Sequence, residues 1–132
     1  MDKLKFVIPG KPEYLTMVRL AISSIAHNAG FDLDDAEDMK TAVEEACKNV
    51  SCHGFEGFSD QYEVECNVEK GRVEIIVKDA CDQHSLQKIA KPCVDCPKEG
   101  DLGIYVIKTL MNEVEFGRAD DGHKSIRMVK NL

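Results

Sequence analysis

Three side chains able to do chemistry stand at steps of four residues in the chain: Glu45, Asn49 and His53. On a helix, this spacing places them in one row on one side. A carboxylate in such a row can accept a proton, and a carboxamide oxygen can ligate a hard cation such as Mg²⁺ that also carries phosphates. The same spacing is also typical of a helix whose polar flank is merely hydrated, so both interpretations stand at this point.

The element that must carry this row is a helix with a buried side. Apolar residues run beside the row at steps of three and four, which is typical of a helix packed on a core. They are Ala36, Met39, Val43, Ala46 and Val50. Asp32 or Asp34 is the predicted N-cap, and Gly54 the predicted end of a helix of roughly 20 residues. The polar row therefore lies at the edge of a buried face.

Two further segments offer binding chemistry. Val77-Lys78-Asp79 ends an apolar strand in a carboxylate, which either accepts hydrogen bonds from a purine amino group or caps the next turn. Gly100-Asp101-Leu102-Gly103 leads into a helix, whose free N–H groups and dipole favour an anion such as phosphate. Each signal is weak alone, because carboxylates at turns and glycines before helices are common.

The remaining pattern predicts the fold. Alternating residues predict strands near 3–8, 62–69, 73–77, 114–116 and 124–130. Helical periodicity predicts helices over 12–28, over the segment that ends at Gly54, and over 103–111. Residues 80–101 show no period and contain Pro92 and Pro97, which is typical of a functional lid or a disordered loop. We expect one domain over 1–132: a two-layer α/β (α+β) sandwich with three helices on one face of a mixed, mostly antiparallel sheet of about five strands.

Composition narrows the function classes. The 132 residues carry a formal net charge of −7 and are 43% hydrophobic, which is typical of a globular protein. This acidity argues against direct nucleic-acid binding, which needs a basic surface. No apolar run approaches the roughly 18 residues of a membrane span, and no signal peptide is recognisable. We therefore expect a cytoplasmic protein that binds no membrane, with its six cysteines reduced.

The order of these segments resembles the nucleotide-binding order of the histidine-kinase-like ATPase (GHKL, Bergerat fold) superfamily. Within it, the chain is most similar to bacterial anti-sigma-factor serine/threonine kinases. Residues 45–54 resemble their N box, residues 103–116 their third-helix-to-strand segment, and residues 122–127 their closing strand. The resemblance spans nearly the whole chain, and the N box and the segment Leu110-Met111-Asn112-Glu113-Val114 are its most specific parts.

The resemblance implies a protein that binds ATP and Mg²⁺, holds a sigma factor and phosphorylates an anti-anti-sigma (STAS-type) partner, usually as a homodimer. It implies that Glu45 orients or deprotonates the acceptor hydroxyl and that Asn49 holds Mg²⁺ against the phosphates. Asp79 would recognise adenine, and Arg19 would contact protein partners. The phosphate cradle would come from backbone groups at Gly100, Leu102 and Gly103.

The chain also departs from the family pattern. The family expects Asp-x-Gly-x-Gly after the second hairpin strand, whereas here both glycines are replaced, by Cys81 and Gln83. Glycine there permits close backbone approach and positive φ, which the replacements restrict. The alternative is therefore a non-kinase interaction module of the same fold.

The departing segment has metal-like spacing of its own. Cys81 and His84, followed by Cys93 and Cys96, offer two ligand pairs of the kind that tetrahedral Zn²⁺ prefers. This spacing leads to the hypothesis of a lid held by zinc rather than closed over ATP. Free thiols in a variable loop are the other interpretation.

Overall fold

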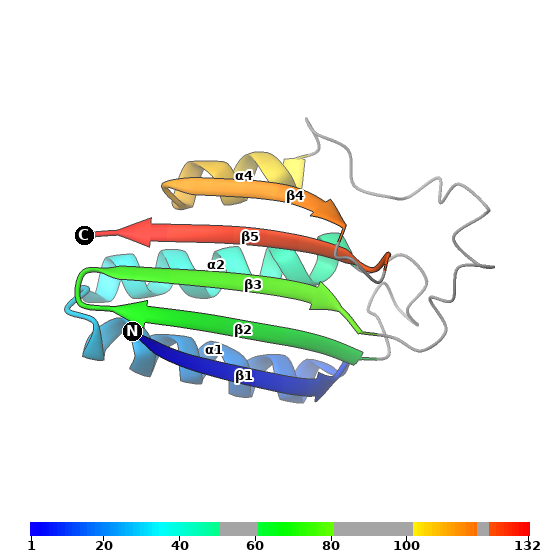
Figure 1. Ribbon diagram of the computed structural model, residues 1–132, viewed down its shortest axis with the longest axis horizontal. Helices are drawn as coiled ribbons and strands as arrows, with labels where there is room; N and C mark the ends of the chain where they lie inside the picture. Colours follow the sequence, from blue (N-terminus) through cyan, green and yellow to red (C-terminus); the bar gives the residue numbers. More distant parts are fainter. Residues whose placement is uncertain (51–60, 81–101, 119–121) are drawn as a thin grey trace.

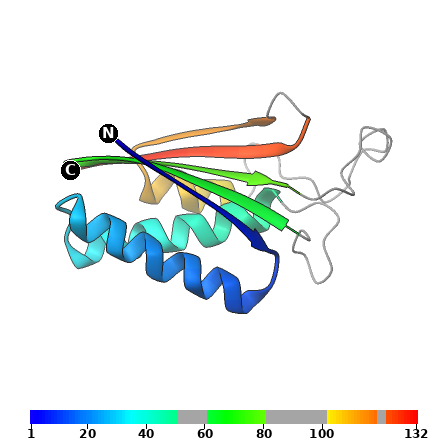
Figure 2. The same ribbon diagram turned by 60° about the horizontal axis from the view of Figure 1, so that its bottom comes forward.

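The computed structural model describes residues 1–50, 61–80, 102–118 and 122–132. In these ranges, helices and strands form two layers, with the helices together on one face of a twisted sheet (Figures 1 and 2). The elements are β1 (Asp2–Pro9), α1 (Pro12–Asn28), α2 (Leu33–Val50), β2 (Gln61–Glu69), β3 (Arg72–Asp79), α4 (Leu102–Leu110), β4 (Glu113–Arg118) and β5 (Lys124–Asn131). The predicted two-layer α/β architecture is confirmed.

The sheet has the strand order β1-β2-β3-β5-β4, and each of these neighbours pairs antiparallel. Of the mixed or antiparallel character that the sequence left open, the structure has the antiparallel one. After α4 the chain enters at the outer edge as β4, and β5 then returns between β4 and β3. This return makes β5 antiparallel to both of its neighbours.

Local signals set the bounds of α1 and the start of α2 as the sequence predicted, whereas the predicted helix end at Gly54 lies outside the described residues. Pro12 occupies the first turn of α1, and Gly30 leaves the helix with φ 97°. Asp32 is the N-cap of α2, because its Oδ1 accepts a hydrogen bond of 2.8 Å from the backbone N–H of Asp35. Gly71 turns the β2–β3 hairpin with φ 77°.

The core lies between the two layers. All five members of the predicted α2 stripe are buried, and so are Val73, Ile75 and Val77 on the helix-facing side of β3. The thiol side chains of Cys47 and Cys66 are buried there as well. Burial, assisted by the nearby Glu44 carboxylate, raises the pKa of Cys47 to about 12, so this thiol stays protonated at neutral pH.

The other face of the sheet carries cross-strand ion pairs. Glu63 lies 3.1 Å from Lys5 Nζ and 3.4 Å from Lys78 Nζ. Arg127 Nε donates a hydrogen bond of 2.6 Å to Glu74 Oε2. Burial opposes ionisation of Glu74, but hydrogen bonds from Asn67 and Arg127 prevail and lower its pKa. The charges of this face are thus satisfied within the sheet.

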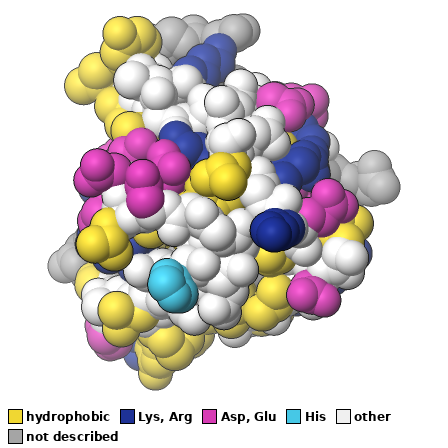
Figure 3. Space-filling view, turned by 90° about the vertical axis from the view of Figure 1, so that its left-hand side faces the viewer, with side chains coloured by type: hydrophobic (Ala, Val, Ile, Leu, Met, Phe, Trp, Pro, Cys, Tyr) yellow, Lys and Arg dark blue, Asp and Glu magenta, His cyan; other side chains and the backbone are white. Residues whose placement is uncertain are grey.

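A second polar cluster joins the helices to β5. Lys130 Nζ donates a hydrogen bond of 2.6 Å to the backbone carbonyl of Leu110, at the last turn of α4. It also lies 3.5 Å from Asp38 Oδ2 and 3.8 Å from Asp35 Oδ1, in the early turns of α2. Figure 3 views this end of the molecule, where acidic and basic side chains alternate with hydrophobic ones.

Candidate functional site

The predicted site residues converge at the opposite end of the helix layer. The end of α2, the start of α4 and the end of β3 all lie at this end of the molecule (Figure 1). α2 packs against both α4 and β3, so the three segments belong to one packed unit. Asn49 comes from α2, Gly103 from α4 and Asp79 from β3.

Asn49 of α2 lies close against Gly103 of α4. A Cβ placed on Gly103 would lie 2.5 Å from Asn49 Nδ2 and 3.1 Å from Asn49 Oδ1. Such distances exclude a side chain at residue 103 unless Asn49 moves. The Asn49 amide thus lies directly against the first turn of α4, where backbone N–H groups are not used within the helix.

The orientation of Asn49 follows from a second contact. Its Nδ2 donates a hydrogen bond of 2.7 Å to the backbone carbonyl of Glu45, one turn earlier. This bond uses the amide nitrogen and leaves Oδ1 as the oxygen that can serve a cation. An amide oxygen is a ligand of the kind that Mg²⁺ accepts.

Glu45 lies on the same flank of α2. Its side chain is 27% exposed, and its Oε1 lies 3.7 Å from Lys48 Nζ. The pair is solvated and longer than a direct hydrogen bond, so it holds the carboxylate only loosely. Glu45 and Asn49 share the polar edge that the spacing of four predicted.

Asp79 is placed differently, because it is fully buried at the last position of β3. It lies opposite Tyr62 of β2, which is also fully buried. Strand alternation directs Asp79 to the helix-facing side together with Val77. The carboxylate therefore lies at the inner corner of the site, beneath the end of the sheet.

Arg19 belongs to a different part of the surface. It lies on α1, and its Nη1 is 3.7 Å from Glu44 Oε2, with each side chain 37% exposed. Its Nε is buried and has no hydrogen-bond partner within the described residues.

Several predicted residues lie outside the described ranges. These are Gly100, the four residues of the zinc hypothesis (Cys81, His84, Cys93 and Cys96), His53, and the lid apart from Ala80. In the part of the chain that the structure describes, no group of three or more His, Cys, Asp or Glu side chains is arranged to hold a metal ion. In the same part, no helix combines the length and the apolar character that crossing a membrane requires.

The metal-ligating and hydrogen-bonding groups of the described site residues fit ATP with Mg²⁺. The fit rests on the Gly103 position, where an added Cβ would displace the Asn49 amide. Asn49 Oδ1 supplies a hard oxygen for Mg²⁺, and the helix start supplies N–H groups for phosphate. The buried Asp79 carboxylate would be the acceptor for a purine amino group.

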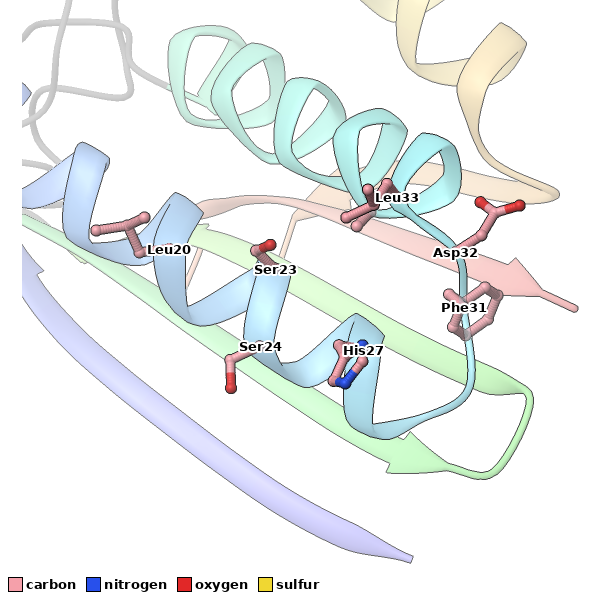
Figure 4. Close-up of a pocket in the computed structure, with 8 residues that line it drawn as sticks. Leu20, Ser23, Ser24, His27, Phe31, Asp32 and Leu33 are labelled. Carbon is pink, nitrogen blue, oxygen red and sulfur yellow. The ribbon is translucent and has the colours of Figure 1, made fainter.

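A groove of about 800 Å³ lies elsewhere, between α1 and the start of α2. Figure 4 shows Leu20, Ser23 and His27 of α1 facing Leu33 of α2 across it. None of the predicted nucleotide-binding residues lines this groove. It is therefore a feature separate from the candidate site.

Sequence reasoning missed one residue at the site end of the sheet. Lys124 begins β5 and is only 3% exposed, although lysine is seldom buried. Alternation with the apolar Ile126 and Met128 would have placed Lys124 on the inner face. The sequence contained this alternation, but it did not show which strand pairs with β5.

Comparison with known proteins agrees with this geometry. Residues 8–130 match the family of the histidine kinase-like ATPase domain. The chain belongs to this family.

Curated relatives that match the chain include serine-protein kinases. Serine-protein kinase RsbW of Bacillus licheniformis is 38% identical over 123 residues, which cover 86% of this chain and 76% of the relative. RsbW of Bacillus thuringiensis strain Al Hakam is 34% identical, with the same coverage. A chain of the SiaB–SiaC complex from Pseudomonas aeruginosa shares the fold, with a TM-score of 0.65 at 15% identity, covering 96% of this chain and 88% of that one.

Proposed function

We propose that this chain is an ATP-binding anti-sigma factor with serine/threonine protein kinase activity. It sequesters a sigma factor and phosphorylates an anti-anti-sigma partner of the STAS type in the cytoplasm. The observation that carries the proposal is the contact of Asn49 with Gly103, one turn from Glu45, in a chain of the histidine kinase-like ATPase family. The proposal assigns residues 1–132 to one such domain.

Each described site residue has one role in this proposal. Asn49 holds Mg²⁺ through Oδ1, while its bond to the Glu45 carbonyl fixes the amide. The start of α4, from Leu102 and Gly103, binds phosphate oxygens through backbone N–H groups, and Gly100 extends this cradle. Asp79 accepts a hydrogen bond from the adenine amino group. Bound ATP·Mg²⁺ supplies the phosphoryl group and neutralises the charge that develops on it.

Glu45 is the proposed catalytic residue. It accepts the proton of the serine or threonine hydroxyl, or orients that hydroxyl toward the phosphate. The loose contact with Lys48, at 3.7 Å, leaves the Glu45 carboxylate able to turn toward a substrate. A carboxylate in this place on the outer edge of α2 is reachable by a protein substrate, because 27% of the side chain is exposed.

Protein partners are proposed to contact α1 around Arg19. The exposed side of this helix carries Tyr14, Met17 and Leu20, the last of them 64% exposed. Apolar side chains gathered beside an arginine are typical of protein interfaces. Here Arg19 would exchange its long contact with Glu44 for a partner carboxylate. A homodimer is proposed as the working form.

The first experiment measures Mg·ATP binding by calorimetry and by the shift in Tm. Wild type is expected to bind, whereas Asn49→Ala is expected to lose at least about tenfold in affinity because a Mg²⁺ ligand is removed. Lys70→Ala, in the hairpin turn at the opposite end of the sheet, is the matched control and should bind as wild type does. If wild type shows no binding, the kinase proposal fails and the chain is a non-kinase interaction module.

The second experiment separates chemistry from binding. Wild type, Glu45→Gln and Lys48→Gln are incubated with labelled ATP and an anti-anti-sigma protein from the same genome. Glu45→Gln should bind Mg·ATP normally but transfer phosphate roughly 10²–10⁴-fold more slowly. Transfer at the wild-type rate by Glu45→Gln would remove the proposed base, and Lys48→Gln tests whether the neighbouring charge alone matters.

A further inference from the structure

The strand β4 forms one outer edge of the sheet, beyond β5 (Figure 1). Among the described residues, no strand pairs with the far side of β4. An edge strand presents a row of backbone N–H and C=O groups to any extended chain that lies along it. The six residues of β4 include no proline, so every one of them carries a backbone N–H group.

The side chains of β4 alternate between the two faces of the sheet. Val114 and Phe116 belong to the helix-facing side, because their partners on β5 are fully buried. Phe116 is nevertheless 39% exposed. Glu113 and Glu115 belong to the other, open face of the sheet. The edge thus has an apolar side and an acidic side.

A small pocket opens on the apolar side of this edge. We call it the β4 pocket, and its lining is Ile104 and Lys108 of α4 with Val114 and Phe116 of β4. Its volume is about 160 Å³. A cavity of about 150 Å³ holds a benzene-sized group, so the pocket has room for one leucine or phenylalanine side chain. A backbone edge and a neighbouring pocket for one side chain are the two elements of peptide recognition by strand addition.

The acidic side indicates the charge of the occupant. Glu113 and Glu115 are 52% and 72% exposed. Arg127 Nη1 lies 3.8 and 3.5 Å from their carboxylates, while its Nε makes the hydrogen bond of 2.6 Å to Glu74. The longer, solvated contacts neutralise the two carboxylates only in part. Lysine or arginine on an added strand would therefore lie favourably beside them.

The same charges argue against a second copy of this chain as the occupant. If β4 paired with β4 of another copy, the glutamates of both copies would lie on the same face of the joined sheet. Like charges on opposing strands are destabilising. The acidic side therefore favours a basic partner and disfavours self-association at this edge.

We propose that the outer edge of β4 binds an extended segment of a partner protein as an added strand. The segment carries one large apolar side chain, which fills the β4 pocket, and a lysine or arginine on each side of it, beside Glu113 and Glu115. Because successive side chains of a strand alternate between faces, this order of residues matches both sides of the edge. The edge lies across the sheet from β1 and α1 (Figures 1 and 2), so this surface is separate from the one around Arg19 and does not depend on the proposed function.

The probe is the synthetic peptide acetyl-Thr-Lys-Thr-Lys-Leu-Lys-Thr-amide, titrated into the isotope-labelled full chain. We expect saturable NMR shift changes in the amides of β4 and in α4 around Ile104 and Lys108. A peptide with serine in place of leucine should bind at least about tenfold more weakly, because the β4 pocket stays empty. Absence of binding, or saturable changes confined to other elements, would overturn the proposal.

The charge of the edge is tested from both sides. Glu115→Lys should weaken binding of the peptide about fivefold or more, because a favourable cross-strand contact becomes a repulsive one. Glu69→Lys, at an exposed position at the end of β2, is the matched control and should bind within about twofold of wild type. If Glu115→Lys does not fold, a peptide with glutamate in place of the lysines that flank leucine makes the same test on wild type. Binding that is indifferent to these charges would contradict the proposed occupant.

Strand addition needs a readout that docking of side chains alone does not produce. In an added strand every second N–H group points to β4. Methylation of the backbone nitrogen should therefore abolish binding at one of two neighbouring peptide residues and change it by less than about twofold at the other. Equal effects at both residues would show that the peptide does not pair as a strand. Shifts of the β4 amides on dilution of the chain alone would identify a second copy as the occupant and overturn the proposal.

Discussion

The two ends of the α2–α4 pair are built in opposite ways. At one end, Lys130 of β5 donates to the Leu110 carbonyl of α4 and lies near Asp35 and Asp38 of α2, so charge and hydrogen bonding join three elements. At the other end, the Asn49 amide packs against Gly103, which has no side chain to keep it away. Polar interactions thus hold the two helices together at the Lys130 end, which we call the fastened end. At the Asn49 end the helices pack directly against each other, and we call this packing the bare contact.

This difference separates stability from function along one helix pair. At the Lys130 end, the polar groups are already engaged with one another and hold α4 on α2. The Asn49 end carries the Asn49 amide oxygen, the backbone N–H groups at the start of α4 and, one turn earlier on α2, the Glu45 carboxylate. These groups can bind a ligand. If the contrast is correct, substitutions at the two ends should affect different measurements.

The largest effect on binding is expected from Gly103→Ala. The added Cβ would lie 2.5 Å from Asn49 Nδ2, so the amide must turn away and give up its bond to Glu45. Mg·ATP affinity should fall at least about tenfold, because the Mg²⁺ ligand and the phosphate cradle both shift. The Tm should change little, since alanine favours a helix over glycine by up to about 1 kcal/mol and offsets the local rearrangement. Calorimetry and a melting curve check both halves.

Gly117→Ala is the matched control for that substitution. A Cβ at Gly117 would meet nothing within 4 Å, so neither binding nor Tm should move appreciably. Unchanged ATP affinity in Gly103→Ala would show that the bare contact is packing alone. The contrast between the two ends would then have no functional meaning.

Lys130→Met is expected to lower the free energy of unfolding while leaving ATP affinity largely unchanged. It removes the hydrogen bond of 2.6 Å to Leu110 and the compensation of Asp35 and Asp38, while methionine keeps most of the apolar stem. Unfolding free energy should fall by about 1.5–3 kcal/mol, as for other hydrogen bonds to charged groups. Urea unfolding measures the loss, and Lys3→Met, at a 66% exposed lysine, should cost far less. A tenfold loss of ATP affinity in Lys130→Met would contradict the separation of the two ends.

How far the sequence determined these features depends on how local each signal is. The bounds of α1 at Pro12 and Asn28 were predicted correctly, because proline, periodicity and Gly30 all act within a few residues. The Asp32 cap and the turn at Gly71 are local for the same reason. The row of Glu45 and Asn49 was predicted because a helix repeats its faces at fixed steps.

Features that join distant segments were not predictable in the same way. Parity alone places Lys124 on the inner face of β5, but the strand that it lies beside depends on the pairing of β3 with β5, about 50 residues apart. The family resemblance placed Asn49 and Gly103 in one site, whereas the contact between them depends on how α2 packs on α4. The sequence left a mixed or an antiparallel sheet open, because strand direction follows from the return of the chain through β4.

The smallest effect is expected from Asp32→Ala, which removes a local device from the fastened end. The Asp32 carboxylate caps α2 by accepting the Asp35 N–H at 2.8 Å, and this loss should cost about 1 kcal/mol of unfolding free energy. Asp34→Ala, in the exposed first turn, loses only its favourable interaction with the helix dipole, a few tenths of a kcal/mol. In combination with Lys130→Met, the Asp32→Ala loss should be nearly additive, because Lys130 contacts Asp35 and Asp38 through their side chains and the cap uses a backbone N–H. A strong coupling between the two would mean that the cap and the lysine stabilise α2 as one unit, and the fastened end would then have to be described as a single cooperative structure rather than as separate contacts.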